Sequence, residues 1–423
     1  MSEANLLLAL AFLMIAPLAL AGLALINTGL GRSRSAAQAL LGNLLMLAVA
    51  VVCFALLGAS IAGIPLAGQG VTLQLAGKSW HLFGLAPFAL SWLGGATPLA
   101  QLGLLFEFLA VGFIGMLPWG SGADRLRLEA GAVIAALFGL VLFPLMAHWT
   151  WGGGWLAVLG TNFGLGDGFL DVGGAASIHV LGGVSALAVV WIAGARKGKF
   201  PKEGFSTALP GHIAVNILFG SFLALIGWTA WNLAGALLWL RDGVAALPVV
   251  ALNTLLNAAA ALIATFIVTR IRFGKPDASL CANGWLAGLV TSSACAALSN
   301  PGQAIFTGAV AGLLTPLLVE VLELALSIDD PSGAVTVHAV GGLWGLFAAG
   351  VFAPKSGQLL AQLVGISTLL GLMLPLIYGI LLGLDQLLPL RVDPDGERIG
   401  MDLHELGGGA YPEFVLHRDE SYR

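Results

Sequence analysis

Charged residues are scarce in this chain of 423 residues, because Asp, Glu, Lys and Arg together make up only 9% of it. Soluble domains carry roughly 25% of such residues, so an ordinary water-covered surface is excluded. The three cysteines, Cys53, Cys281 and Cys295, form no CxxC pair and indicate neither a disulfide framework nor a metal site. A GxxxxGK[ST] loop is also missing from the sequence, which argues against an ATP-driven pump. We therefore expect no metal, no cofactor, no enzymatic activity and no nucleic-acid partner.

Apolar residues and glycine are abundant instead, with 58% hydrophobic residues and 59 glycines. Repeated apolar runs of about 20 residues predict an all-α polytopic membrane protein. Small residues suit such a bundle, because they let helices approach closely within lipid. We predict eleven transmembrane helices, near residues 5–29, 37–64, 97–119, 127–149, 172–194, 209–239, 244–270, 279–298, 303–326, 333–353 and 358–389. Residues 1–390 would form the membrane domain, and residues 391–423 a cytoplasmic C-terminal tail.

The basic residues predict how the chain is oriented. Of the 18 Lys and Arg residues, all but Lys78, Arg241 and Lys355 fall into one set of alternate loops and the tail. Basic residues concentrate on the cytoplasmic side of membrane proteins. The expected protein is therefore a multi-pass protein of the cell (inner) membrane, with its N-terminus outside and its C-terminus in the cytoplasm.

One sequence pattern occurs twice. Residues 171–183 read DVGGAASIHVLGG and residues 330–342 read DPSGAVTVHAVGG, so each copy has an Asp eight residues before a His and a Gly-Gly pair after it. The copies fall in the fifth and tenth predicted spans, which cross the membrane in opposite directions. Such an arrangement is typical of an inverted repeat. We predict two inverted halves of five spans, about 5–194 and 209–353, followed by an eleventh helix at 358–389.

The two histidines of this pattern are the candidate site. Eight helical residues rise about 12 Å, so His179 and His338 reach well into a hydrocarbon layer of about 30 Å from opposite faces. We expect the two rings to meet within hydrogen-bond reach. We also expect Asp171 to be buried at the start of its helix, where it accepts hydrogen bonds from backbone amides. An ionisable pair at this depth is typical of a substrate pathway. A histidine that only ties two helices together, and haem ligation by the pair, are the alternatives.

Several stretches, taken in order, resemble the ammonium transporter (Amt/Mep/Rh) family. They are WGGG (151–154), GWTAWNLAG (227–235), NGWLAGLV (283–290), SNPGQAIFTGAVAG (299–312), IDDPSGAVTVHAVGG (328–342) and GMDLHELGGGAYPEF (400–414). The resemblance covers nearly the whole chain. It implies a hydrophobic pore for ammonium or ammonia, and for methylammonium, in each subunit of a homotrimer embedded in membrane lipids. It also implies a PII-type regulatory protein as a partner of the tail.

The resemblance further assigns roles to particular residues. His179 and His338 would line the narrow pore, and Asp171 would support an outer site that recruits the cation. Trp151 would form one wall of that site, and Trp231 takes the position of a gating phenylalanine. The tail would pack on the inner loops of a neighbouring subunit. There its charges would pair with Arg125, Arg127 or the basic cluster at 196–202.

The chain departs from the family pattern at the outer site. Gly235 stands where a serine hydroxyl is usual, so recruitment should be weaker, and Ala110 stands where a second gating phenylalanine is expected. Phe106 or Phe108 could supply that gate. Glu107, between them, would be either a second cation site or a neutral acid bonded to a neighbouring helix. These departures leave a second function open, namely an ammonium sensor with little or no transport on the same scaffold.

Overall fold

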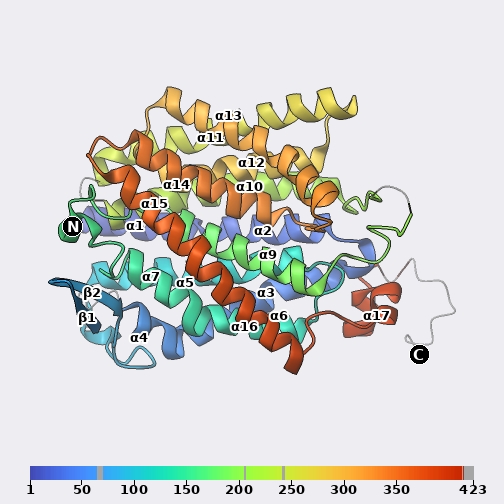
Figure 1. Ribbon diagram of the computed structural model, residues 1–423, viewed down its shortest axis with the longest axis horizontal. Coiled ribbons are helices and arrows are strands. Elements are labelled where there is room, and N and C mark those ends of the chain that lie inside the picture. The colour runs from blue at the N-terminus through green and yellow to red at the C-terminus, as the bar shows by residue number, and fades with distance from the viewer. Residues whose placement is uncertain (64–69, 204–205, 241–242, 412, 414–423) are drawn as a thin grey trace.

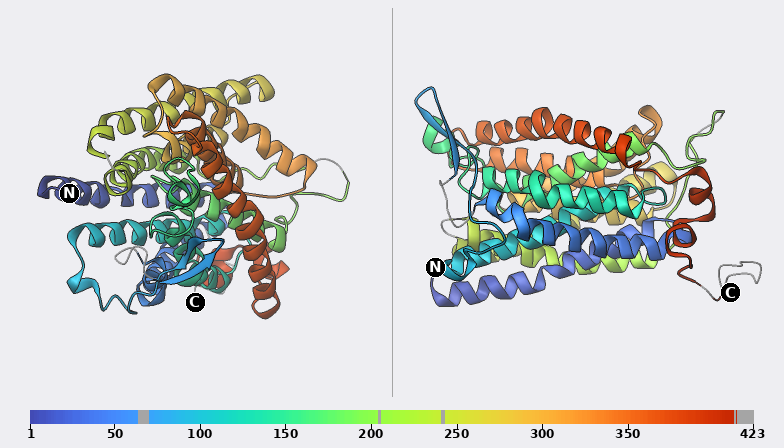
Figure 2. Two further views of the ribbon diagram at one scale, coloured as in Figure 1. Left: turned by 60° about the vertical axis from the view of Figure 1, so that its left-hand side comes forward. Right: turned by 90° about the horizontal axis from the view of Figure 1, so that it is seen from below.

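The computed structural model describes residues 1–63, 70–203, 206–240, 243–411 and 413. Arg241, which was expected on the outer side, and Arg418 and Arg423 of the tail lie outside the described residues. The protein is a bundle of long helices that run along one common direction (Figure 1). Figure 2 shows the same bundle from two further sides, with α16 and α1 on its surface.

Ten helical segments of the described chain are long and apolar enough to cross a membrane. They are Glu3–Leu30, Ser33–Ala62, Pro98–Ser121, Leu128–Thr150, Ala175–Ala193, Ala214–Trp239, Gly243–Phe273, Pro301–Ala325, Val335–Phe352 and Gln358–Leu387. Each overlaps one of the predicted spans. The sequence therefore predicted the polytopic helical fold correctly.

Several of these segments are divided by a turn of different winding. Their parts are α1 (Glu3–Ile15), α2 (Pro17–Leu30), η1 (Ser33–Ser35), α3 (Ala36–Cys53), η2 (Phe54–Gly58), α4 (Ala59–Ala62), α5 (Pro98–Ser121), α6 (Leu128–Leu137), η5 (Phe138–Leu142), α7 (Phe143–Thr150), η6 (Ala175–Val180), α9 (Leu181–Ala193), α10 (Ala214–Trp239), α11 (Gly243–Phe273), α13 (Pro301–Glu320), η7 (Val321–Ala325), η8 (Val335–Val340), α14 (Gly341–Phe352), α15 (Gln358–Thr368), η9 (Leu369–Met373) and α16 (Leu374–Leu387). The π-helical turns η6 and η8 carry the two candidate histidines.

The predicted span at 279–298 is the helix α12 (Ala278–Cys295), which is not among those ten segments. Its 18 residues include Asn283, Thr291, Ser292 and Ser293, all of them buried, and these polar residues lower its hydropathy. The helix packs on α10, α11, α13 and α14. Surrounding helices, rather than lipid, therefore cover α12, and the total of eleven spans stays a prediction.

Close helix crossings depend on small residues, as expected for a bundle in lipid. A Cβ atom on Gly308 of α13 would lie 2.2 Å from the carbonyl oxygen of Asn257 on α11. One turn later, a Cβ atom on Gly312 would lie 2.0 Å from the carbonyl oxygen of Ala261. Any side chain at these positions would push the two helices apart.

The expectation of an all-α protein missed a small β-hairpin. Strands β1 (Val71–Leu75) and β2 (Lys78–Phe83) pair antiparallel within the predicted loop 65–96. The hairpin packs beside the end of α7, where Trp149 Nε1 donates to the Leu82 carbonyl oxygen (2.7 Å), and beside the segment that follows α7, where Trp155 lies against Trp80. Short helices complete the loops: η4 (Leu93–Gly95) and α8 (Leu159–Phe163).

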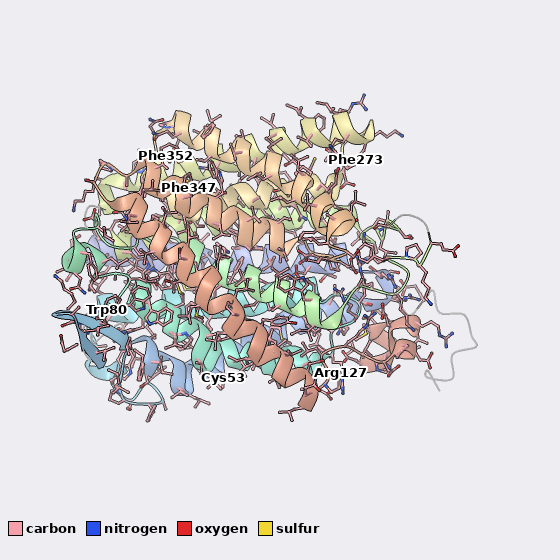
Figure 3. The ribbon with its side chains drawn as sticks, in the orientation of Figure 1. Cys53, Trp80, Arg127, Phe273, Phe347 and Phe352 are labelled. Carbon is pink, nitrogen blue, oxygen red and sulfur yellow. The ribbon has the colours of Figure 1, made fainter. Side chains whose placement is uncertain are left out.

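The hairpin and the tail mark opposite ends of the bundle. The hairpin and the N-terminus lie at one end, called the hairpin end below, and the tail elements α17 (Pro394–Ile399) and η10 (Asp402–Leu406) lie at the other, the tail end (Figure 1). Figure 3 labels Trp80 at the hairpin end, and Arg127 and Phe273 at the tail end.

Candidate functional site

The two histidines of the repeated pattern touch each other inside the bundle. Nδ1 of His338 lies 3.3 Å from Nδ1 of His179, and both residues are 2% exposed. One ring nitrogen therefore donates a hydrogen bond to the other. The predicted contact between the two rings is confirmed.

The same local fold presents each histidine. Before η6, Gly174 has φ +81°, and before η8, Gly333 has φ +70°, a left-handed conformation that glycine adopts readily. Asp171 accepts hydrogen bonds from the amides of Ala176 (3.0 Å) and Ser177 (2.9 Å). Asp330 accepts one from the amide of Val335 (2.8 Å). In both copies, a carboxylate thus satisfies backbone donors at the start of the helix that carries the histidine.

Asp171 is 4% exposed and also accepts a hydrogen bond from the Ser177 hydroxyl (2.7 Å). Its expected burial and its backbone partners are confirmed. Asp330 differs, because it accepts hydroxyl hydrogen bonds from Ser121 of α5 (2.7 Å) and from Ser332 (3.3 Å). Burial raises the pKa of Asp330.

Two aromatic residues that the sequence did not single out flank the histidine pair. The Trp228 ring stacks on His179 at 4.8 Å and 19°, and Trp228 Nε1 donates to the Ser293 hydroxyl (2.8 Å). The edge of Phe113 meets His179 at 5.4 Å between ring centroids. Trp228 precedes Trp231 by three residues, a spacing that puts both on one face of α10. This spacing in the sequence could have indicated that Trp228 lies near the site.

Four aromatic side chains form a cluster at the hairpin side of the histidines, here called the aromatic cluster: Phe106, Trp151, Trp231 and Trp239. Phe106 is fully buried, with its ring 4.7 Å from that of Trp231 and 5.3 Å from that of Trp151. Trp239, which the sequence reading did not select, stacks on Trp151 at 5.5 Å and 8°.

The turn that begins with Asp171 holds two of these rings in place. Trp151 Nε1 donates to the Asp171 carbonyl oxygen (2.7 Å), and Trp231 Nε1 donates to the Gly173 carbonyl oxygen (3.1 Å). The same short segment therefore positions the aromatic cluster and starts the helix of His179. Trp239 Nε1, in contrast, has no hydrogen-bond partner among the described residues.

The structure separates the candidates on α5. Phe106 joins the aromatic cluster, whereas Phe108 packs its ring on Phe54 of η2 at 5.2 Å and is not brought to the cluster. Ala110 is fully buried one turn after Phe106. Glu107 is fully buried as well, and neither carboxyl oxygen has a partner within the described part of the chain. The hydrogen bond from Glu107 to a neighbouring helix, one of its two expected roles, is thus not found.

Gly235 has a steric role that the sequence reading missed. A Cβ atom at this position would lie 2.2 Å from the carbonyl oxygen of Val172. The helix α10 passes that close to the turn after Asp171, so a larger residue would displace the turn. The position that lacks the expected hydroxyl group is therefore also a position where two backbone segments lie very close together.

The tail end carries a buried ionic network. Arg196 donates to both carboxyl oxygens of Asp329 (2.9 and 3.0 Å) and to Asp124 (3.0 Å). Arg125, fully buried, donates to the Asp329 carbonyl oxygen (2.8 Å). Burial opposes ionisation of Asp329, but hydrogen bonds from Arg196 and the charges of both arginines outweigh it and lower its pKa to about 2. Burial lowers the pKa of Arg125 to about 10, so both groups are ionised near neutral pH.

The tail packs on loops of its own chain. Glu397 accepts hydrogen bonds from Arg391 (2.6 Å) and from the Lys197 amide (2.6 Å). Asp402 accepts from the Gln38 amide in the first turn of α3 (2.8 Å), and Glu405 from the Leu128 amide at the start of α6 (3.1 Å). These two tail carboxylates therefore cap two long helices.

The expected charge pairing of the tail needs a correction. Lys197, from the 196–202 cluster, does bind the tail. Arg125, however, pairs with Asp329, and the side chain of Arg127 pairs with Glu129. Asp329 is buried beside Arg125, with 3.6 Å between their charged groups, so it forms the ion pair with Arg125 in place of a tail carboxylate. Contact of the tail with a neighbouring subunit stays a prediction.

The protein is a polytopic helical membrane protein, and two histidines that are hydrogen-bonded to each other are buried in its interior. Ionisable residues at such positions are found along transport pathways. The residues described here contain no cluster of three or more potential metal ligands. The model of the Ammonium Transporter Family matches residues 5–411. The chain belongs to that family.

Relatives and solved structures agree with this assignment. The chain is 31% identical over 434 residues to ammonium transporter Amt2 of Archaeoglobus fulgidus, covering 95% of this chain and 86% of that protein. It is 32% identical over 419 residues to Amt2 of Haloferax mediterranei, covering 93% and 87%. Its fold matches a protein described as "Sensor Amt Protein" with a TM-score of 0.84, 25% identity, and 95% and 98% of the two chains covered. It also matches Mep2 of Candida albicans with a TM-score of 0.76 at 22% identity, covering 93% and 87%.

Proposed function

We propose that the chain moves ammonium or ammonia across the membrane through a pore that passes His179 and His338. The observation that carries the proposal is the 3.3 Å contact between the two Nδ1 atoms, deep inside an apolar bundle. An imidazole accepts and donates protons near neutral pH. With the Nδ1 atoms turned toward each other, the Nε2 atoms are left for a guest molecule in the pore.

The physical chemistry of ammonium favours passage without its charge. Desolvating a bare cation in an apolar lane is very unfavourable, whereas neutral ammonia needs only hydrogen-bond partners. Beside His338 the described residues enclose a void of only about 10 Å³, roughly the space of one water molecule. A lane this narrow suits a molecule of that size. The proton would pass to water at the aromatic cluster or to a ring nitrogen of the histidine pair.

The aromatic cluster is the proposed recruitment site. Aromatic faces attract ammonium through cation–π interaction. Trp151 and Trp231 are its proposed walls, and Phe106, whose ring lies 4.7 Å from that of Trp231, is together with Trp231 the proposed gate. Asp171 acts by holding the turn that orients both indoles.

The proposed topology is eleven membrane helices, with α12 as the eighth, an outer N-terminus and a cytoplasmic tail. Opposite positions of the N-terminus and α17 in Figure 1 support it, because an odd number of crossings brings the chain ends to opposite sides. The matched turns before η6 and η8 support an inverted repeat of residues 5–194 and 209–353. Residues 1–390 are the proposed membrane domain. Assembly as a homotrimer, and a PII-type partner for the tail at 391–423, rest on family membership.

The test is current on solid-supported membranes carrying proteoliposomes, after a jump to ammonium chloride. We expect a saturable current that falls at least tenfold in His179→Ala and in His338→Ala. His404→Ala, in the tail, is the matched control and should keep the wild-type current. Equal currents in wild type and both pore variants would contradict the proposal. A wild-type protein that neither carries current nor speeds alkalinisation of the vesicle lumen over protein-free vesicles, but is stabilised against heat by ammonium, would instead identify it as a sensor.

A further inference from the structure

The loop between the β-hairpin and α5, residues 84–97, is apolar and carries no charge. It reads GLAPFALSWLGGAT, and the nearest charged residues on its two sides are Lys78 and Glu107. Its largest outward side chains are Leu85 and Phe88, which are 60% and 63% exposed. Large apolar side chains on the surface of an uncharged segment indicate contact with something other than water.

The segment runs back along a membrane-spanning helix instead of away from it. Its successive amides donate to carbonyl groups of α4 and η2 that lie further and further from the end of that helix: Gly84 to Ile61 (2.7 Å), Ala86 to Ser60 (3.1 Å) and Ala89 to Leu56 (3.1 Å). The chain then turns at Ala89 and Leu90, both in the left-handed region with φ 51° and 56°. The segment therefore descends beside the helix and reverses next to Leu56.

The depth of this turn follows from the length of the helix beside it. The spanning segment Ser33–Ala62 has 30 residues, which extend for about 45 Å. A membrane is about as thick when its headgroups are included, and its hydrocarbon layer of about 30 Å begins roughly 8 Å from each surface. Leu56 lies six residues before the end of the segment, and six helical residues rise about 9 Å. The turn at Ala89 thus reaches the boundary between headgroups and acyl chains.

The surroundings of the segment fit such a position. Trp92 and Leu93 pack on the core of the bundle, so one side of the segment is held by the protein. Val52 and Leu56, on the helix along which it runs, are each 56% exposed, so the apolar surface of the helix continues onto the segment. Backbone amides along the segment donate to carbonyl groups, as an apolar medium requires: those of Gly84, Ala86, Ala89, Ser91, Leu93, Gly95 and Ala96.

We propose that residues 84–97 lie within the membrane leaflet at the hairpin end, with Leu85 and Phe88 inserted among the lipid acyl chains. Lipid is the partner that fits, because the segment is uncharged, descends along a spanning helix and continues the exposed apolar surface of that helix. Aromatic residues are favoured at this depth of a membrane. The segment leads directly into Thr97, whose hydroxyl caps α5, so lipid contact would help to fix the start of the helix that carries Phe106.

The test measures how a fluorophore at Phe88 is quenched in proteoliposomes. The label is NBD on a single introduced cysteine, in a Cys53→Ala background, because Cys281 and Cys295 are buried. One quencher is iodide in the water, and the other is a nitroxide on the lipid acyl chain close to the glycerol. Val52→Cys is the control for a position in lipid, and Gln74→Cys, on exposed strand β1, is the control for a position in water. We expect iodide to quench Phe88→Cys about fivefold less than Gln74→Cys, because an ion does not enter an apolar layer. The nitroxide lipid should quench Phe88→Cys at least as strongly as Val52→Cys.

Iodide quenching at Phe88→Cys equal to that at Gln74→Cys would overturn the proposal. Protection from both quenchers would overturn it as well, since a second copy of the chain would then cover this face. If Phe88→Cys does not fold, Leu85→Cys decides with the same expectations. A protein that carries no ammonium current would contradict the proposed function and leave these expectations unchanged.

Discussion

At the hairpin end, four aromatic rings cluster on that side of the histidine pair, whereas a cavity at the tail end has carboxylates, arginines and an asparagine in its wall. The turns that present the two histidines are nevertheless closely alike, each with an Asp, a left-handed Gly and a π-helical turn. The two turns thus share their backbone conformation, whereas the side chains around them differ. The repeated pattern positions the histidines, and we propose that the side chains added at each end determine how each end treats a cation.

The two ends also differ in how firmly they are held. Arg196 and Asp329 connect three loops by buried, charge-assisted hydrogen bonds at the tail end. At the hairpin end the indoles of Trp151 and Trp231 are held by single hydrogen bonds to neutral carbonyl groups. Charge-assisted bonds are roughly twice as strong as neutral ones. We therefore expect substitutions at the tail end to affect folding first, and those at the hairpin end to affect ligand affinity first.

The largest effect is expected for Asp329→Ala. It leaves the buried Arg196 and Arg125 without their main counter-charge, and breaking a buried pair costs about 3–5 kcal/mol. Heat denaturation in detergent should show a large drop in the midpoint. The exposed pair of Asp395 and Arg398 is the control, since removing it costs about 0–1 kcal/mol. Equal midpoints for Asp329→Ala and Asp395→Ala would contradict the contrast between buried and exposed pairs.

The lowered pKa of Asp329 predicts that the stability of the folded protein depends on pH. The pKa of this carboxyl group is about 2 in the folded protein, below the ordinary value of about 3.9. A lowered carboxyl pKa stabilises the fold fully above the unfolded value, and this stabilisation is lost as the pH falls through the folded value. The wild type should therefore lose stability between about pH 4 and pH 2, in part through Asp329. Asp329→Asn should show a smaller loss over that interval.

A smaller effect is expected for Gly235→Ser, which restores the hydroxyl group that the family pattern contains. A Cβ atom there would lie 2.2 Å from the Val172 carbonyl oxygen, so the turn after Asp171 must move. Overpacking of this kind costs about 1–3 kcal/mol. We expect a lower denaturation midpoint and a raised half-saturating ammonium concentration from the hairpin side. Gly371→Ser is the matched control, because a Cβ atom at Gly371 meets nothing within 4 Å. A normal midpoint together with tighter binding in Gly235→Ser would restore the reading of Gly235 as a missing acceptor.

Effects of about 1 kcal/mol each are expected when the tail carboxylates that cap helices are removed. Asp402→Ala exposes amides in the first turn of α3, and Glu405→Ala does so at the start of α6. Hydrogen exchange should become faster in those first turns and in the tail, and remain unchanged in α10. Glu413→Ala, further along the exposed tail, is the control. Unchanged exchange in the first turns of α3 and α6 would show that the caps do not hold the tail.

The sequence alone predicted the parts of this structure that depend on local spacing. The eight residues from Asp171 to His179, and from Asp330 to His338, gave the paired turns and the contact between the rings. It did not predict Phe113 or Trp239, because the face that a buried helix turns inward depends on its neighbours, and it missed Trp228 although the spacing of three residues from Trp231 places both on one face of α10. Gly235 is instructive in the same way, since its steric role arises from Val172, 63 positions earlier in the chain.

The hairpin and the tail illustrate two further limits. The hairpin was missed although VTLQL and KSWHLF flank a short turn at Gly77, because two strands of five and six residues do not form the long apolar runs that mark membrane helices. The acidic residues of the tail were read as partners for arginines. Two of them instead bind backbone amides of helices more than 270 positions away, which no local pattern encodes.

The smallest expected effect tests whether Trp239 belongs to the proposed recruitment site at the hairpin end. Its ring stacks on Trp151 at 5.5 Å, so it covers one face of that indole and meets the edge of Phe106. A cation–π contact at a partly exposed position contributes about 0.5–1 kcal/mol, which corresponds to a two- to fivefold change in affinity. If Trp239 is a wall of the site, Trp239→Leu should raise the hairpin-side half-saturating ammonium concentration by that factor, and Trp151→Leu should raise it more. If Trp239 instead covers the Trp151 face in the absence of ligand, Trp239→Leu should lower the same value, because the cation then no longer has to displace a ring. The tail-side value should stay constant in both variants, and a parallel change there would show that the two ends do not recognise the cation separately.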